Sequence, residues 1–321
     1  MQTFLKKRIA LTMPIVLYLL FSLLSSRFDL SNFTIILIQS IIPTMIGFAL
    51  YQLLAGGLFD LSFGAQMILA AYIGGEMSKK FGVIGLVLGC LLSGILLSAI
   101  TGILYTLLKI PSMVLSMCLV MLYEPLPYIL FKKPYISIPK EIAYLGKQPY
   151  NILIAVAIFI IFYLISYHTK YSCHLRTIGS DEDLASILGI KTKKVKLQAY
   201  LIAGMFSGVA SLLYICYSNN ISYATSLSSI SLVFKPLMGV MIAMELVSSI
   251  NVGFGILIGE FCIAVLFNGL IALGLPSTWQ NMTLGLFLLF VIAITNNRTS
   301  ISLQWSRFKS LFLWKKQVDT N

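Results

Sequence analysis

The sequence predicts an all-α polytopic membrane protein with about ten transmembrane helices and with both termini in the cytosol. Hydrophobic residues make up 58% of the 321 residues and charged residues only 11%, which is far from the composition of a soluble domain. Apolar runs long enough to cross a bilayer recur along the chain. The length alone would suggest two domains, but these runs favour one transmembrane domain over residues 1–321.

Ten apolar segments underlie this prediction. In chain order they are 9–24, 34–54, 60–77, 82–108, 111–131, 150–168, 195–217, 229–248, 252–274 and 280–296. The third and the last are short for a bilayer crossing, so the third is open to a re-entrant interpretation, whereas the fourth is long enough to tilt. Lys6-Lys7-Arg8 resembles the start of a signal peptide, but Ser25-Ser26-Arg27 is a poor cleavage site. We therefore expect the first segment to remain as a span.

Basic residues decide the orientation, because loops on the cytosolic side carry an excess of Lys and Arg. An even number of spans places both termini on one side, where 15 of the 23 basic residues then lie, with 7 on the other side. The first side is therefore predicted to be cytosolic, and it includes the loop 169–196 and a basic tail, 296–321. The net charge of +12 follows from this topology and indicates attraction to membrane lipid, not to nucleic acid.

The loop 169–196 contains a predicted short helix. Ser180 or Asp181 is suited to cap its start, since a short polar side chain there accepts a hydrogen bond from a free backbone N–H group. Glu182 and Asp183 place negative charge on the first turn, where the helix dipole favours it. The sequence therefore predicts a helix that begins at about residue 181.

One face of this helix is apolar. Leu184, Ile187 and Leu188 have the spacing i, i+3, i+4, and Gly189 is the expected stop. A two-turn helix between membrane spans has nothing local against which to bury such a face. We therefore expect it to dock into a groove of a partner protein.

The junction before the third span combines paired glycines with an acidic residue. Gly56, Gly57, Asp60 and Ser62 lie in this stretch. The combination is typical of a broken backbone that lines a cavity, and a carboxylate within the membrane is a candidate functional group. The alternative is that Asp60 merely caps the third span.

Five further charged residues lie in or at the ends of spans: Glu76, Glu124, Lys235, Glu245 and Glu260. Pro125 and Pro127 follow Glu124 and must interrupt the hydrogen bonding of the fifth span, which would open a polar pocket. Lys235 and Glu245 are about 15 Å apart along one predicted helix, so they cannot pair with each other. Each of these two requires a partner elsewhere or a position near an interface. A place on a pathway through the membrane is the alternative for any one of the five.

Small residues recur every four positions in several spans, which allows close helix contact. The rows are Gly85, Gly89 and Ser93; Gly94, Ser98 and Gly102; Gly204 and Gly208; and Gly255 and Gly259. Packing accounts for them, and we assign them no chemistry.

The sequence gives no support for an enzyme. The only histidines are His168 and His174, and the chain contains no Gly-rich phosphate loop, no His-Glu-x-x-His and no Gly-x-Ser-x-Gly. The five cysteines have no metal-ligand spacing and are typical of small core residues. We expect no catalytic residue, no metal site and no cofactor.

Three segments together resemble one known family. Gly56-Gly57-Leu58-Phe59-Asp60-Leu61-Ser62-Phe63-Gly64 resembles a Gly-Gly-x-x-Asp-Leu-Ser-x-Gly element, and residues 179–196 resemble a coupling loop that ends in Gly-Ile and a basic stretch. Residues 203–210 resemble the small-residue span that follows it. Asn268-Gly269-Leu270, Gly274-Leu275-Pro276 and Trp279-Gln280 also fit. The family comprises the permease subunits of ABC importers for ribose-type sugars, related to those for branched-chain amino acids and nucleosides.

The resemblance implies a multi-pass protein of a bacterial cytoplasmic membrane with ten helices per subunit and a pore between two subunits. It also implies separate ABC ATPase subunits and an external substrate-binding protein. The helix that receives the ATPase stroke would comprise Ser180, Asp181, Glu182, Asp183, Leu184, Ile187, Leu188 and Gly189. The element associated with the translocation path would comprise Gly56, Gly57, Asp60 and Ser62.

One departure from the family pattern concerns the second half. Family members repeat a glycine-rich element there, of which Gly239 to Glu245 and Val252 to Gly255 keep only a part. We carry over no site residue from this region. The departure favours a heterodimer with a second permease subunit over a homodimer.

We therefore expect a permease subunit for a sugar or sugar-like solute, with nucleosides, autoinducer-type solutes and branched-chain amino acids as alternatives. Two other classes of protein fit parts of the pattern. An ion-coupled secondary transporter would have similar spans and intramembrane carboxylates, but it needs no apolar cytosolic helix. A purely structural membrane protein would tolerate the loss of every intramembrane charge.

Overall fold

The computed structural model describes residues 2–25, 28, 32–139, 141–246 and 251–276, together with 279, 282, 283, 285, 286 and 289. The chain divides into two units, Met1–Leu273 and Gly274–Asn321. In the second unit the Trp279 N–H group donates to the Pro276 carbonyl at 3.0 Å, and Thr283 Oγ1 donates to the Trp279 carbonyl at 2.8 Å. The larger unit contains both of the predicted sites.

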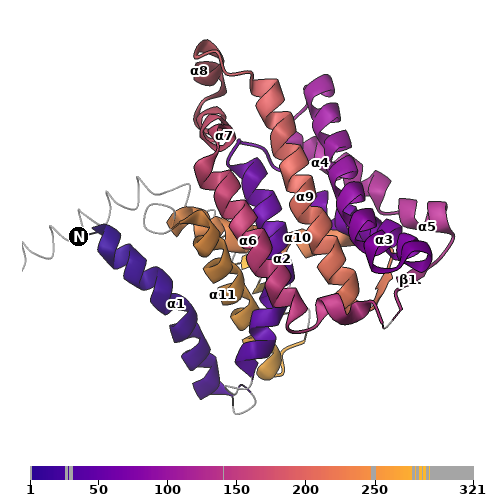
Figure 1. The fold of residues 1–321 in the computed structure, drawn as a ribbon. Coiled ribbons are helices and arrows are strands. Elements are labelled where there is room, and N and C mark those ends of the chain that lie inside the picture. The colour runs from indigo at the N-terminus through magenta and orange to yellow at the C-terminus, as the bar shows by residue number, and fades with distance from the viewer. Residues whose placement is uncertain are drawn as a thin grey trace, which may run out of the picture. The chain divides into compact units, whose positions relative to one another are not determined.

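The larger unit is helical apart from one small antiparallel sheet. Its elements are α1 (Gln2–Leu24), α2 (Asn32–Leu54), α3 (Phe63–Leu108), α4 (Ser112–Tyr123), α5 (Leu126–Phe131), β1 (Tyr135–Ser137), η1 (Ala143–Gly146), α6 (Tyr150–His168), α7 (Lys170–Ser180), α8 (Glu182–Ile187), α9 (Thr192–Ser218), β2 (Asn220–Ser222), η2 (Ser228–Ile230), α10 (Ser231–Leu246) and α11 (Val252–Ala272). β1 pairs with β2, with Ile136 opposite Ile221. α9 packs against both α3 and α2, and α10 packs against α11 (Figure 1).

The prediction of an all-α polytopic membrane protein is confirmed. Six helices of the described chain are long and apolar enough to cross a membrane: Phe33–Leu54, Phe63–Leu108, Ser112–Phe131, Tyr150–His168, Thr192–Ser218 and Val252–Ala272. Two shorter apolar helices, Pro14–Leu24 and Ser228–Met244, coincide with the predicted first and eighth spans. Most of the tenth predicted span, 280–296, and the tail 296–321 lie outside the described residues. The count of ten spans and the cytosolic termini stay predictions.

α3 unites the third and fourth predicted spans. Its 46 residues would extend for about 69 Å, more than twice the ~30 Å hydrocarbon core of a bilayer. The helix is interrupted at Gly82, which has φ 60° and ψ −142°, a backbone conformation that disfavours any residue with a Cβ atom. α3 therefore consists of two helices that meet at Gly82, where the sequence predicted a junction.

Small residues bring α3 and α9 into backbone contact, as the four-residue spacing predicted. A Cβ atom added to Gly94 would lie 2.6 Å from the Cα atom of Gly208, and one added to Gly204 would lie 2.7 Å from the Cβ atom of Ser98. The Ser98 hydroxyl donates to the Tyr200 carbonyl across the same contact, at 2.7 Å. Side chains larger than these cannot fit without separating the two helices.

We expect Gly94→Leu to lower the free energy of unfolding by about 3 kcal/mol, because overpacking at this contact must displace backbone as well as side chains. Leu96→Phe is the matched control, since Leu96 is an exposed residue of the same helix. The measurement is denaturant unfolding of the purified protein in detergent. Equal stability of the two variants would contradict the prediction.

Candidate functional site

The predicted helix in the loop 169–196 is α8, and residues next to it in sequence determine both of its ends. The Asp181 carboxylate accepts the Leu184 N–H group at 3.0 Å, so Asp181 is the cap. Ser180 instead ends α7, where its hydroxyl donates to the Thr177 carbonyl. Gly189 has φ +79° and ends the helix, as the sequence predicted. Its N–H group donates to the Ser186 carbonyl, while that of the following residue donates to the Ala185 carbonyl.

The apolar face of α8 is uncovered within the described chain. The exposed fractions are 50% for Leu184, 80% for Ile187 and 65% for Leu188, whereas Ala185 is fully buried against the rest of the chain. Complete burial of one such side chain is worth about 1.5–3 kcal/mol. Three exposed apolar side chains on one short helix therefore form a surface that gains stability when another protein covers it.

An ion pair fastens α8 to the membrane helices. The Glu182 carboxylate lies 2.7 Å from the Nζ atom of Lys196 in the first turns of α9. This ammonium group is nearly buried, donates to the Tyr105 hydroxyl at 3.3 Å and lies 5.3 Å from the centre of the Tyr105 ring. Because Tyr105 belongs to α3, these contacts connect α8 with both α9 and α3.

α7 contacts the paired glycines that follow α2. A Cβ atom on Gly179 would lie 2.2 Å from the Ala55 carbonyl oxygen, and one on Gly56 would lie 2.6 Å from the Cδ1 atom of Leu175. Gly57 has φ +72°, and the Cα atom of Gly179 lies 3.6 Å from where its Cβ atom would be. The structure therefore brings together two sequence elements that are more than 110 residues apart.

Asp60 and Ser62 begin a buried line of polar side chains. The Asp60 Oδ1 atom accepts the backbone N–H group of Ser62 at 2.7 Å and its hydroxyl at 2.6 Å. Gln66 Nε2 donates to the Ser62 hydroxyl at 2.7 Å and to Thr101 Oγ1 at 3.4 Å. All four side chains are almost completely buried. Asp60 thus shapes the turn before α3 but does not cap the helix, because Ser62 is the N-cap residue and the Asp60 carboxylate bonds none of the first free N–H groups of α3.

Several polar atoms of this buried region have no hydrogen-bond partner in the described chain. They are Asp60 Oδ2, Gln66 Oε1, Tyr200 Oη and Ser229 Oγ. Buried polar atoms are normally hydrogen-bonded, so unpaired ones deserve an explanation. They offer hydrogen-bonding capacity for a polar solute or for water. Sequence reasoning singled out Asp60 and Ser62 but missed Gln66 and Thr101, whose only signal is that they are polar residues within apolar runs.

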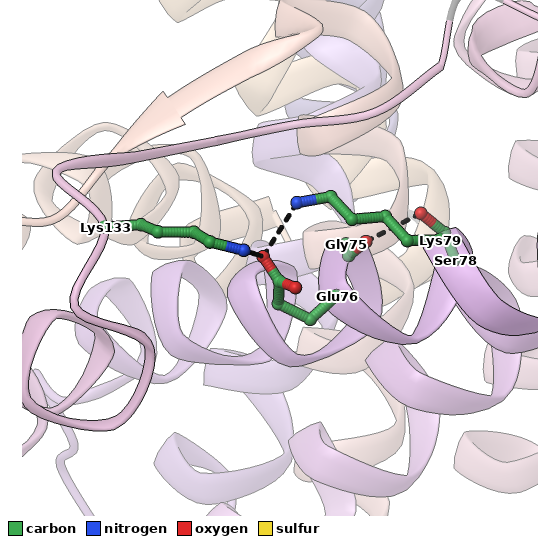
Figure 2. A network of polar contacts seen from close by, with 5 residues as sticks. All are labelled: Gly75, Glu76, Ser78, Lys79 and Lys133. Atoms are coloured by element: carbon green, nitrogen blue, oxygen red, sulfur yellow. Dashed lines mark hydrogen bonds and ion pairs between the residues drawn. The ribbon is translucent and has the colours of Figure 1, made fainter.

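Glu76 forms ion pairs near the end of the first part of α3, before the break at Gly82. Its Oε1 atom lies 2.8 Å from Lys79 Nζ and 2.6 Å from Lys133 Nζ, and Figure 2 shows the two lysines reaching this one oxygen. The hydrogen bond to Glu76 raises the pKa of Lys133. This cluster joins the first part of α3 to the segment after α5, which explains lysines on the predicted outer side.

The remaining charged residues of the spans differ in their surroundings. Lys235 Nζ lies 4.3 Å from the centre of the Phe267 ring. Both carboxylate oxygens of Glu260 are buried without a hydrogen-bond partner in the described chain, and a Cβ atom on Gly239 would lie 2.2 Å from Oε1. The side chain of Glu245 lies outside the described residues. Glu124 bonds two backbone N–H groups of the second half, at Leu227 and Ser229.

A groove of about 510 Å³ lies between α1, α2, α6 and α11. Its lining includes Phe33, Ile41, Phe159 and Phe261, and the hydroxyls of Ser40 and Thr44 within it already donate to carbonyls of α2. The lining is apolar and its two hydroxyls are already hydrogen-bonded, so this groove does not provide the polar groups that a hydrophilic solute needs.

Comparison with known proteins identifies relatives over almost the whole chain. The family model described as branched-chain amino acid transport system / permease component matches residues 32–292. The autoinducer 2 import system permease protein LsrC of Photorhabdus luminescens is 26% identical over 299 residues, which are 88% of this chain and 88% of the relative. The protein of the same name from Yersinia pseudotuberculosis serotype O:3 (strain YPIII) is 25% identical over 276 residues, or 83% and 77% of the two chains. No solved structure matches.

Proposed function

Because the chain belongs to the ABC importer permease family described as branched-chain amino acid transport system / permease component, we propose that it forms the translocation path for a sugar or sugar-like solute. As a member of this family it is a transport subunit and a multi-pass protein of the bacterial inner membrane. The Asp60-Leu61-Ser62 element and the autoinducer 2 import permeases among its relatives support the solute class, with autoinducer-type solutes included. The residues of the path are Gly56, Gly57, Asp60 and Ser62.

The single observation that carries the mechanism is the exposed apolar face of α8. We infer that Leu184, Ile187 and Leu188 enter a groove of a separate ABC ATPase, and that the side of the membrane on which α8 lies is the cytosol. Closure of the ATPases then moves α8, and the contacts at Gly179 and Lys196 pass the movement to the Gly56–Gly57 segment and to α9. The helices rock about the path and expose it to each side in turn. An external substrate-binding protein delivers the solute.

The test is affinity purification from native membranes followed by reconstitution into proteoliposomes. We expect an ATPase to accompany the chain. We also expect uptake of a ribose-type sugar or autoinducer 2 to require ATP on the side of the membrane where the ATPase lies and the binding protein on the opposite side. Uptake that persists without ATP and collapses with the ion gradient would replace this proposal with an ion-coupled transporter.

The assembly is proposed to be a heterodimer. The motivation is the incomplete glycine-rich element around Gly239 to Glu245 in the second half. Mass spectrometry of the intact purified complex is expected to find one copy of this chain and one of a different permease. A complex with two copies of this chain and no second permease would refute the heterodimer while leaving the importer assignment intact.

A further inference from the structure

The segment between β2 and α10 is a turn in an unusual backbone conformation. Ser226 and Leu227 have φ angles of 58° and 63°, so two consecutive residues other than glycine occupy the left-handed region. L-residues seldom adopt this region, and they keep it only where the surrounding structure holds them there. Contacts with another part of the chain must therefore stabilise this backbone conformation.

Glu124 holds this turn. Its Oε2 atom accepts the Leu227 N–H group and its Oε1 atom accepts the Ser229 N–H group, both at 2.9 Å. The side chain is only 3% exposed, and no salt bridge of the described chain includes it. Hydrogen bonds to an ionised carboxylate are stronger than those between neutral groups. We call this arrangement the Glu124 clamp.

The clamp lies deep in the membrane helices. Glu124 ends α4 twelve residues after its first residue, Ser112, which corresponds to about 18 Å along a helix and to more than half of the ~30 Å bilayer core. Backbone that is not helical is tolerated at this depth only where protein buries it or where it lines a cavity. The broken helix at Pro125 and the turn at Ser226–Leu227 thus meet at Glu124, within the apolar stretch Ser112–Phe131.

The turn held by Glu124 packs directly against Gly64, the last residue of the Gly56–Gly64 segment. A Cβ atom on Gly64 would lie 2.1 Å from the Ser229 carbonyl oxygen, so only glycine permits this contact. Gly64 is two residues from Ser62, and the buried Ser229 hydroxyl is without a hydrogen-bond partner in the described chain. The backbone of the turn therefore lies against Gly64, close in sequence to the Asp60–Ser62 segment.

We propose that Glu124 is a positioning residue of the translocation path, which fixes the turn 225–230 against Gly64 so that the turn forms the second-half wall of the path. The inference rests on the proposed role of Asp60 and Ser62 in that path. Glu124 itself does not contact the solute; it acts through the backbone of Leu227 and Ser229.

The test compares Glu124→Gln with the matched control Glu76→Gln, which removes a carboxylate charge near the end of the first part of α3. A Gln side chain has one acceptor oxygen and turns an NH₂ group towards one of the two backbone N–H groups, so the clamp must open. We expect kcat/KM for ATP-driven uptake to fall at least tenfold in Glu124→Gln and to change less than twofold in Glu76→Gln.

A second readout does not depend on transport. Ser229→Cys places a thiol at a buried position, and its modification by a small maleimide in the purified protein is followed by peptide mass spectrometry. We expect modification at least tenfold faster when Glu124 is also replaced by Gln. If Glu124→Gln does not fold, Glu124→Asp keeps the charge but shortens the reach, and the same acceleration is expected.

The outcomes separate the two proposals. Unchanged labelling in the Gln and Asp variants would overturn the clamp. Faster labelling with unchanged kcat/KM would show that the clamp is structural only and would overturn its role in the path. Absence of ATP-dependent uptake by the unmodified complex would refute the proposed function, while the labelling comparison would still decide whether Glu124 holds the turn.

Discussion

Ile187→Asp is expected to abolish ATP-driven uptake while the chain still inserts into the membrane in normal amount. Ile187 is the most exposed of the three apolar residues on α8, so the substitution costs the free chain nothing in packing. In a partner's groove, however, an unpaired carboxylate loses its water, which disfavours the complex by several kcal/mol. A loss of about 2.8 kcal/mol already corresponds to a hundredfold weaker association.

The matched control is Ser186→Asp, which adds the same charge to the same helix. At 100° per residue Ser186 lies on the side of α8 away from Leu184, Ile187 and Leu188, and it is exposed. The measurements are co-purification of the ATPase and uptake in proteoliposomes. If both variants retain the ATPase and transport normally, α8 is not the docking helix.

Gly179→Ala is expected to reduce uptake at least tenfold with the ATPase still bound. The new Cβ atom would lie 2.2 Å from the Ala55 carbonyl oxygen, so α7 must move away from the segment that leads to Asp60. Because the docking face on α8 is untouched, association is preserved and only the transmission of movement is lost. Hydrolysis of ATP without uptake is therefore the expected signature.

Cys173→Ala serves as the comparison, because Cys173 is an exposed residue of the same helix. ATPase activity and uptake are measured on the same preparations, together with their yield after size-exclusion chromatography. Wild-type uptake by Gly179→Ala would show that the close contact between α7 and the paired glycines does not transmit the movement.

Local sequence patterns predicted those parts of the molecule whose structure is determined locally. The ends of α8 depend on the Asp181 side chain and on the left-handed conformation of Gly189, and both are decided within a few residues. The apolar spans follow from the need to satisfy every backbone hydrogen bond inside the bilayer. The small-residue contact between α3 and α9 is likewise visible in the four-residue spacing.

The parts that the sequence did not predict depend on contacts between distant segments. Nothing local indicates that Gly179 lies against Ala55, because this contact arises only when α7 folds onto the end of α2. Glu124 was recognised as a charged residue before two prolines that interrupt the span, but its partners are backbone N–H groups of a turn, which no side-chain motif marks. Gln66 and Thr101 were missed for the same reason, because only the folded helix bundle brings their side chains within hydrogen-bonding distance of each other.

The short β1–β2 ladder has a consequence for which parts of the chain move together. Tyr135–Ser137 and Asn220–Ser222 share backbone hydrogen bonds, so the link after α5 and the link after α9 cannot move apart without breaking the ladder. Ser222 is followed within a few residues by the turn at Ser226–Leu227. The ladder therefore ties the segment that follows Lys133 to the chain that enters the turn held by Glu124.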